Sequence, residues 1–376
     1  MKIVDVRSFD LVIPYEVEGR PPWNVDRVIK SRKFTLVIVY TDEDICGFSG
    51  GNGHLANIIN STVKPFLIGE SPFEIEKHLE IFLNTKTWFV EVALWDIIGK
   101  KANLPLYKLW GAARDKVKAY ASTYELGTPE ERAKQAKHYQ EQGFKALKIR
   151  FHSETMQEDL SYLDAVINAV GENMDILVDA NQAIPATLIL PFPRKGPKWD
   201  YQRAFRTAKE LEERGVVWLE EPLERWDFEN LARLTRNTEI YIAGGEMNTG
   251  LHEFRWMIEK KCYDILMPDP IIAVTLSQTM KIKALCEAFN IHFSPHHGVS
   301  AIGLAVNINL LCTYPGWTYV EYMYDPPWRT IETYLNLGGI IKTTLHIDKE
   351  GYLSPPSLPG IGIEIDEEKI NDYIVS

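Results

Sequence analysis

Three acidic residues stand at the ends of short apolar runs, where their carboxylates could share a cation. Asp179 follows an Ile-Leu-Val run, Glu220 a Val-Val-Trp-Leu run and Glu246 an Ile-Ala-Gly-Gly run. If the runs are parallel strands of one barrel, their carboxyl ends meet on one face, where three anions repel unless a cation lies between them. Each carboxylate could instead only cap the following helix. An oxygen-only donor set favours one Mg²⁺ per chain, with Mn²⁺ as the second choice.

An aspartate and a histidine end two later runs and could form an acid–base pair. Met267-Pro268-Asp269 and Ser294-Pro295-His296 place them on successive strands. A carboxylate bonded to one imidazole nitrogen fixes the tautomer and raises the pKa, which leaves the other nitrogen as a base. His297 is adjacent and competes for this role, and a lone histidine at such a place is commonly structural.

Two basic residues share one side of an earlier run, Leu147-Lys148-Ile149-Arg150. The strand period of two aims both side chains into the barrel, and His152 points the same way at its rim. Arginine stays protonated and is a poor base, but its planar fork suits a carboxylate or an enediolate. Lys148 could titrate if a neighbouring cation depresses its pKa.

The residues that carry this chemistry lie in a long alternation of apolar runs and amphipathic segments from about Ala119 onward. We expect strands at Ala146–Ile149, Ile176–Val178, Val216–Leu219, Ile240–Ala243, Ile265–Met267, Ile291–Phe293 and Tyr319–Val320. We expect helices at Pro129–Gln142, Gln157–Val170, Tyr201–Arg214 and Leu276–Phe289, the first capped by Thr128 and the second ended by Gly171. Such alternation predicts a parallel sheet closed as an α/β barrel.

The two ends of the chain lack this alternation. Met1–Val12 and Lys33–Tyr40 resemble antiparallel strands, and Glu74–Leu83 and Phe89–Ala102 resemble helices. We predict an α+β unit at residues 1–115, a catalytic barrel at 116–340 and a C-terminal segment at 341–376 that packs back on the first unit. The long insertion Ala183–Trp199 would be a lid, because long βα loops in barrels are commonly functional.

Composition and net charge limit the kinds of molecule that the protein could bind. The net charge of −11 argues against nucleic acid or an anionic membrane, and no apolar run is long enough to span a bilayer. A bound cation would still permit an anionic substrate. The N-terminus lacks a signal-peptide pattern, and the four cysteines are scattered without metal-ligand spacing, so we expect a cytoplasmic protein.

Several stretches together resemble the enolase superfamily, and within it the mandelate racemase and muconate lactonizing enzyme branch. The stretches are Leu177-Val178-Asp179-Ala180-Asn181, Trp218-Leu219-Glu220-Glu221-Pro222, Ala243-Gly244-Gly245-Glu246, Trp95-Asp96-Ile97-Ile98-Gly99-Lys100-Lys101, Leu109-Trp110-Gly111 and Leu358-Pro359-Gly360-Ile361-Gly362. The resemblance covers essentially the whole chain. It implies a (β/α)7β barrel of the TIM type, with an α+β capping domain formed by the N-terminal segment and the C-terminal tail.

The resemblance also implies roles for individual residues. Asp179, Glu220 and Glu246 would be the magnesium ligands. His296 rather than His297 falls at the position of the family's base, with Asp269 as its partner, and Glu321 matches a carboxylate that binds the substrate carboxylate or the enediolate. The family often has Lys-x-Lys where this chain has Lys148-Ile149-Arg150. The second position is therefore not a base here.

The expected reaction is abstraction of the α-proton of a hydroxylated carboxylate, such as an acid sugar, followed by loss of the β-hydroxyl to give a 2-keto-3-deoxy acid. With Arg150 in place of a second lysine, dehydration by one histidine is favoured over racemisation by two bases. A racemase, epimerase or cycloisomerase, or a metal-binding barrel without catalysis, remains an alternative. The polar residues expected at the mouth of the barrel favour a hydroxyl-rich small molecule as substrate. We also expect a homo-oligomer. The candidate substrate contacts are Asn181, His152, His297, Trp23 and His54.

Overall fold

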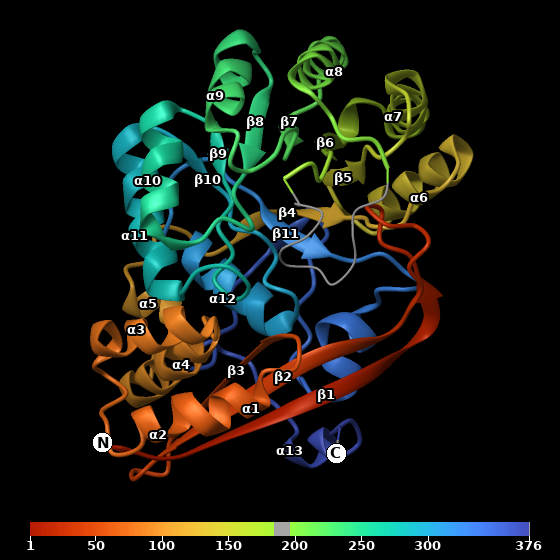
Figure 1. Cartoon of the computed structure of the whole chain (residues 1–376). Helices are drawn as coiled ribbons and strands as arrows, with labels where there is room; N and C mark the ends of the chain where they lie inside the picture. The colour runs from red at the N-terminus through yellow and green to blue at the C-terminus, as the bar shows by residue number, and fades with distance from the viewer. Residues whose placement is uncertain (184–195, 376) are drawn as a thin grey trace.

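The N-terminal part of the chain forms an antiparallel sheet with helices beside it. The computed structural model describes residues 1–183 and 196–375. Strands β1 (Ile3–Gly19), β2 (Ile29–Thr41) and β3 (Cys46–Asn52) pair in that order, and β1 and β2 form a long ribbon across the lower face of the molecule (Figure 1). The expected strands of this unit are therefore longer than the sequence suggested, and β3 was missed. Its helices are α1 (Ala56–Ile58), a π-helical turn at Ile59–Val63, α2 (Lys64–Leu67), α3 (Ile75–Thr85), α4 (Val90–Ala102) and α5 (Leu106–Leu109).

The rest of the chain forms a curled, mostly parallel sheet. Its strands are β4 (Val117–Ser122), β5 (Ala146–Arg150), β6 (Asp175–Asp179), β7 (Trp218–Glu220), β8 (Tyr241–Gly244), β9 (Ile265–Leu266), β10 (His292–Phe293) and β11 (Val320–Met323). They lie in the order β10-β9-β8-β7-β6-β5-β4-β11, and β12 (Tyr352–Leu353) adds to β4 in the antiparallel sense. The alternation in the sequence therefore correctly predicted an α/β fold with a parallel sheet.

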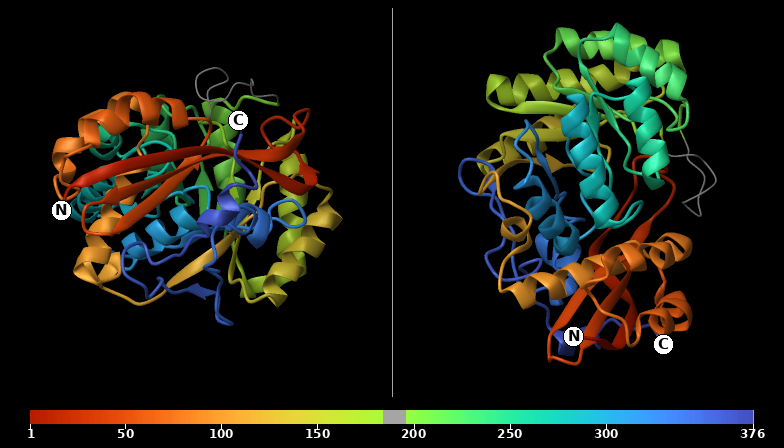
Figure 2. Two further views of the ribbon diagram at one scale, coloured as in Figure 1. Left: turned by 90° about the horizontal axis from the view of Figure 1, so that it is seen from below. Right: turned by 90° about the vertical axis from the view of Figure 1, so that its left-hand side faces the viewer.

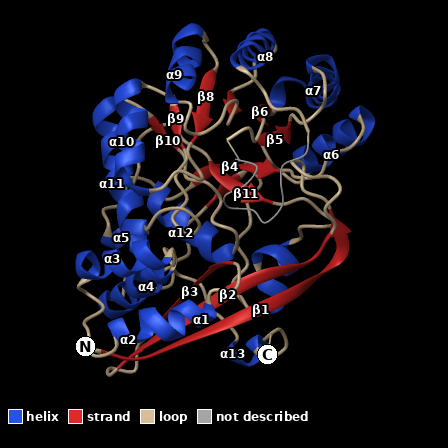
Figure 3. Ribbon diagram, in the orientation of Figure 1, coloured by secondary structure: helices blue, strands red, loops and turns tan. Residues whose placement is uncertain are grey.

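One helix follows each parallel strand from β4 to β10, and these helices surround the sheet (Figure 3). They are α6 (Pro129–Glu141), α7 (Met156–Val170), α8 (Tyr201–Glu213), α9 (Phe228–Asn237), α10 (Gly250–Lys260), α11 (Leu276–Phe289) and α12 (Ala301–Leu311). Thr128 caps α6 in a capping box with Glu131, and Gly171 ends α7 with a positive φ of 62°, as expected. All residues of α12 are buried, which removes the amphipathic pattern by which a surface helix is recognised.

The two edge strands of the curled sheet, β10 and β11, approach each other through side chains. Thr318 Oγ1 donates to the carbonyl of Phe293 at 2.7 Å, and Ser294 Oγ donates to the carbonyl of Tyr319 at 2.9 Å. Within the described residues no backbone pairing joins these two strands. The curled parallel sheet is thus established, whereas its full closure remains a prediction.

The C-terminal segment contacts both parts of the molecule. Buried Asp96 on α4 accepts from the amide of Ile361 at 2.9 Å and pairs with Lys100 at 2.7 Å. Gly360 has a φ of +78°, and a Cβ there would lie 2.0 Å from the Asp96 carboxylate, so the approach requires glycine. Farther on, the amide of Val12 donates to the carbonyl of Tyr373 at 2.9 Å.

The domain boundaries at residues 115 and 340 remain a prediction. Strand β12 of the C-terminal segment pairs with β4 of the parallel sheet, so this segment is not confined to the first unit. Figure 2 shows the antiparallel sheet and the C-terminal α13 (Glu367–Ile370) beneath the curled sheet. The predicted lid at residues 183–199 falls mostly outside the described residues. Among the described helices, none combines the length and apolar character needed to cross a bilayer.

Candidate active site

Strand register brings three of the predicted site residues together. Arg150 lies opposite Asp179 in the β5–β6 pair, and Asp179 lies opposite Glu220 in the β6–β7 pair. Because parallel strands in register present their last residues at the same edge, three residues distant in sequence become neighbours. All three side chains are buried, with exposures of 8%, 0% and 1% in that order.

Sharp turns follow these strand ends. Asn181 and Glu221 adopt positive φ values of 45° and 47°, and Gly245, directly before Glu246, has a φ of 114°. Glycine and asparagine tolerate this conformation at low cost, whereas glutamate does not, so Glu221 is held there by its surroundings. The turns end each strand immediately beside one of the carboxylates predicted to bind the metal.

Each of the three predicted metal ligands contacts a basic group. Asp179 accepts a short hydrogen bond from Arg150 Nη1, and both oxygens of Glu220 lie 2.9 Å from Lys148 Nζ. Glu246 Oε2 lies 3.2 Å from His296 Nε2. As the side chains stand, no group of three His, Cys, Asp or Glu side chains in the described part of the chain has the arrangement of a complete metal site.

The charges of this region nevertheless fit a divalent cation. Its basic groups are Lys148 and Arg150, which are buried, and His296, whose side chain is 13% exposed, and its buried carboxylates outnumber them: Asp179, Glu220, Glu221, Glu246, Asp269 and Glu321. Both oxygens of Glu221 are buried without a hydrogen-bond partner, and burial together with the charge of Glu246 raises its pKa well above the usual value. Burial likewise raises the pKa of Glu220, although Lys148 opposes this. A doubly charged cation would balance the excess negative charge and give the Glu221 oxygens a partner. Oxygen donors of this kind suit Mg²⁺.

His296 and Asp269 form the expected pair. His296 Nδ1 lies 2.6 Å from Asp269 Oδ2, and the amides of Ile271 and Gly298 donate to the same carboxylate at 2.7 and 3.0 Å. These donors hold the Asp269 carboxylate in place. Because Asp269 binds Nδ1 of His296, the other ring nitrogen, Nε2, faces Glu246. Burial lowers the pKa of His296, but the charges of Glu246, Glu321 and Asp269 more than offset this and raise it well above its ordinary value.

His297 lies in a different environment from its neighbour. Its amide donates to Glu321 Oε2 at 3.1 Å, its ring stacks on Tyr334 with centroids 5.8 Å apart, and its Nε2 is buried without a partner. Burial lowers its pKa to about 3, so the ring is neutral. The geometry therefore separates the two adjacent histidines that the sequence left in competition.

Lys148 and Arg150 both reach the carboxylates, as their spacing predicted. Lys148 is fully buried, and its Nζ lies 2.9 Å from Glu321 Oε1 as well as close to Glu220. Burial lowers the pKa of Lys148, but Glu220 and Glu321 more than offset this and raise it above the ordinary value. The ammonium is thus held as a cation. Arg150 is also anchored by Nε, which donates to the carbonyl of Thr123 at 2.8 Å.

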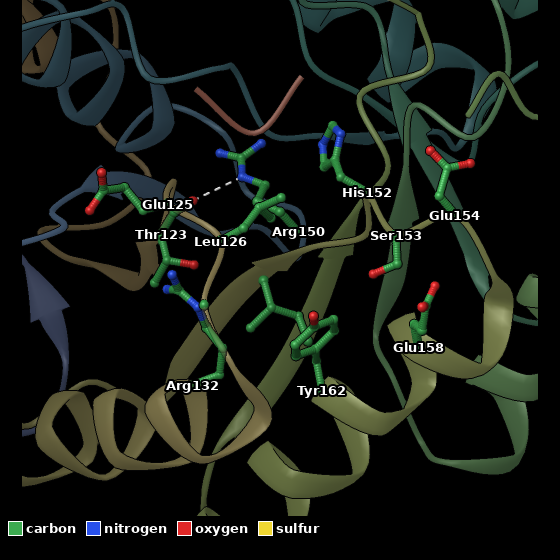
Figure 4. A pocket seen from close by; sticks show the side chains of 12 residues that line it. Thr123, Glu125, Leu126, Arg132, Arg150, His152, Ser153, Glu154, Glu158 and Tyr162 are labelled. Carbon is green, nitrogen blue, oxygen red and sulfur yellow. Dashed lines mark hydrogen bonds between the residues drawn. The ribbon is translucent and has the colours of Figure 1, made fainter. Parts of the chain in front are cut away.

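Asn181 and His152 extend the site toward a pocket. Asn181 Nδ2 donates to Asp179 at 3.0 Å, and its Oδ1 lies 3.0 Å from His152 Nε2. Figure 4 shows Arg150 and His152 on one side of this pocket, opposite Arg132 of α6 and Tyr162 of α7. The pocket has a volume of about 300 Å³ and also contains Glu125, Glu154 and Glu158. Two of the predicted substrate contacts therefore lie between the carboxylates and this pocket.

The remaining predicted contacts differ in position. Trp23 packs edge-on against Tyr124 with ring centroids 5.0 Å apart, and the Arg150 guanidinium lies 5.4 Å from the same Tyr124 ring. Trp23 is therefore one ring away from the site. His54 pairs with Asp10 of β1 at 3.7 Å, on the antiparallel sheet.

Sequence reasoning missed several residues that the structure places at the site. Glu221 was visible next to Glu220 but carried no prediction of its own, and its unpartnered, buried carboxylate distinguishes it only in three dimensions. Ser122 and Thr123 at the end of β4 anchor Arg150 through Oγ and a carbonyl. No sequence signal marks them, because their role depends on the β4–β5 pairing.

Comparison with known proteins agrees with this geometry. Residues 131–369 match the family described as enolase C-terminal domain-like, and residues 16–111 match the mandelate racemase / muconate lactonizing enzyme N-terminal domain. The chain belongs to the enolase superfamily.

Individual members of the superfamily show the same relation. The arabinonate dehydratase of Saccharolobus solfataricus is 30% identical over 291 residues, which cover 76% of this chain and 70% of that protein. The L-talarate/galactarate dehydratase of Salmonella typhimurium is 29% identical over 293 residues, or 73% and 67% of the two chains. A solved structure described as a putative mandelate racemase from Bordetella bronchiseptica, in complex with 2-oxoglutarate/phosphate, superimposes with a TM-score of 0.87 at 27% identity and covers 100% of this chain and 98% of that one.

Proposed function

We propose that this enolase-superfamily member is a Mg²⁺-dependent hydro-lyase that dehydrates an acid sugar to a 2-keto-3-deoxy acid. The observation that carries the proposal is the His296–Asp269 pair beside Glu246, with Lys148 held as a cation between Glu220 and Glu321. His296 can thus exchange a proton, whereas Lys148 is held in its charged form. The relation to two dehydratases supports the choice of reaction.

His296 would act first as base and then as acid. Asp269 occupies Nδ1, so Nε2 takes the α-proton of the substrate. Nε2 must be unprotonated for this step, and the Asp269 carboxylate, 2.6 Å from Nδ1, stabilises the imidazolium that forms until the departing β-hydroxyl takes the proton. The carbon–oxygen bond then breaks, water leaves and the enol product becomes a 2-keto acid. A single histidine suffices for this sequence.

Lys148 and Arg150 would bind and orient the reacting carboxylate, and the Glu321 carboxylate would hold the Lys148 ammonium in place. Both cations lie beside the carboxylates of β6 and β7, where negative charge grows as the enediolate forms. Asp179, Glu220 and Glu246 would hold Mg²⁺, with Mn²⁺ as a second choice, and Glu221, whose buried oxygens have no hydrogen-bond partner, would contribute a further donor. When bound, the ion supplies positive charge to the oxygens of the enediolate. We further propose that the curled sheet closes as a (β/α)7β barrel around these groups, supported by the side-chain bonds between β10 and β11.

An isomerase is the second candidate, favoured by one observation. Lys148 Nζ and His296 Nε2 approach opposite oxygens of Glu321, at 2.9 and 3.8 Å. A racemase or epimerase needs two basic groups, one on each side of the α-carbon of its substrate. The difference lies in whether Lys148 ever gives up its proton.

Hydrogen exchange in D₂O separates the two reactions. Purified protein with Mg²⁺ is incubated with a library of acid sugars, and α-proton exchange and 2-keto-3-deoxy product are measured. For the dehydratase we expect product from the wild type, exchange that survives in Lys148→Met, and neither in His296→Asn. Formation of both stereoisomers, lost in Lys148→Met, would establish an isomerase instead. Full activity in excess EDTA would refute the metal-dependent mechanism altogether.

A further inference from the structure

Two arginines are buried together beside the active site, where the antiparallel sheet meets the parallel one. Arg32 of β2 is 5% exposed, and Arg329 of the loop after β11 is 7% exposed. Their guanidinium carbons lie 4.3 and 4.6 Å from the centroid of the Tyr334 ring. Burial lowers the pKa of Arg32, and the positive charge of Arg329 acts in the same direction. The positive charges of Arg32 and Arg329 thus lie close together in a site shielded from water.

Neither arginine has a carboxylate partner in the described residues 1–183 and 196–375. Arg32 donates to the carbonyl of Tyr334 at 2.8 Å, to Asn52 Oδ1 at 3.2 Å and to the carbonyl of Val299. These acceptors are neutral. The Nε of Arg329 is buried without an acceptor.

The buried acid nearest to Arg329 in the chain, Asp325, is engaged elsewhere. Asp325 accepts from the amides of Tyr124 and Glu125 at 2.7 and 2.9 Å and from Gln135 at 2.5 Å. By contrast, the buried cations Lys148 and Arg150 of the site each contact carboxylates. Buried charges are normally paired with an opposite charge, so two buried cations with only neutral acceptors, and an Arg329 Nε with none, indicate an anion that is not part of the chain.

The two arginines adjoin the catalytic groups through shared rings. The Arg329 guanidinium lies 3.4 Å from the Tyr124 ring centroid, and that of Arg150 lies 5.4 Å from the same ring. Tyr334, which both arginines contact, stacks on His297 next to the proposed base. An anion at Arg329 would therefore be separated from the carboxylate-rich centre by about the width of one side chain.

We propose that Arg329, with Arg32 adding positive charge behind it, binds a second carboxylate of the substrate, remote from the one that reacts. The substrate is then a dicarboxylic acid sugar rather than a monocarboxylic one. This inference rests on the proposed dehydratase function and names the substrate class of the same site. A purely structural role, in which the arginines only fasten the two sheets through their tyrosine contacts, is the competing explanation.

A matched pair of substrates tests the proposal. Each hexaric acid, with a carboxylate at both ends, is compared with the hexonic acid of the same stereochemistry, and kcat/KM for 2-keto-3-deoxy product is measured with Mg²⁺. A charge-assisted contact predicts a preference of about 10–100-fold for the diacid in the wild type. Arg329→Gln should remove that preference, because kcat/KM for the diacid should fall about 10-fold or more beyond any loss for the monoacid. Arg329→Lys, which retains the charge without the fork, should retain part of it.

The control is Arg233→Gln on α9, which removes an exposed arginine 4.1 Å from the Tyr201 ring and should leave the preference unchanged. Equal losses for both acids in Arg329→Gln would show a structural clamp and overturn the proposal. A wild type that accepts the monoacid equally well overturns it too, even if no Arg329 variant folds, and leaves the dehydratase function intact. Absence of product and of exchange with every acid sugar of either kind would refute the proposed function and this inference together.

Discussion

Replacement of His297 by asparagine should change how stability depends on pH. In the native protein the pKa of this buried imidazole is lowered to about 3, whereas in the unfolded chain it is about 6.5. The unfolded state therefore binds more protons between these values. The contribution of neutral His297 to stability is full above about pH 6.5 and is lost as the pH falls toward 3.

The size of the effect follows from the difference between the two pKa values. Each pKa unit corresponds to about 1.4 kcal/mol, so the loss between pH 7.5 and 4.5 is about 2.7 kcal/mol from this residue alone. His297→Asn cannot take up this proton. The stability advantage of the wild type over the variant should shrink by that amount over this range.

Urea unfolding followed by tryptophan fluorescence, with EDTA present, measures the free energy of unfolding at each pH. Carboxylates that titrate in both proteins cancel in the difference. His296→Asn is the matched comparison, and its effect should have the opposite sign. The pKa of His296 is raised in the fold, so its contribution is full below about pH 6.5 and is lost as the pH rises through the folded value. A wild-type advantage over His297→Asn that is independent of pH would refute the assignment of a buried, neutral imidazole.

Three further perturbations test the site. Mg²⁺ at about 100 times its dissociation constant should raise the free energy of unfolding by about 2.7 kcal/mol, measured by urea unfolding, and Glu220→Gln should abolish this gain; an unchanged gain would exclude Glu220 as a ligand. Lys148→Met leaves Glu220 and Glu321 buried without their shared cation, so in EDTA it should destabilise the protein by about 3–5 kcal/mol, and a loss below about 1 kcal/mol would contradict the buried pairing. Arg150→Lys keeps the charge beside Asp179 but loses the fork, and we expect kcat/KM to fall by about 10-fold or more, whereas wild-type kinetics would show that the fork is not used.

The sequence by itself determined which residues could do chemistry and at which strand ends they lie. Strand and helix periods are local properties, and a carboxylate after an apolar run is visible without any knowledge of contacts. The register of β5, β6 and β7 then placed Arg150, Asp179 and Glu220 side by side, as their positions at the strand ends predicted. The pairing of His296 with Asp269 was also foreseen, because both end neighbouring strands.

Only the tertiary structure decided what surrounds these groups. His296 and His297 are adjacent in the chain, yet one contacts three carboxylates and the other packs against Tyr334, and no local pattern distinguishes them. Arg32 and Arg329 lie almost 300 positions apart and became a pair only when β2 and the loop after β11 met. Burial and charge pairing arise from contacts between distant segments, and the pKa of a group depends on those contacts rather than on its neighbours in the sequence.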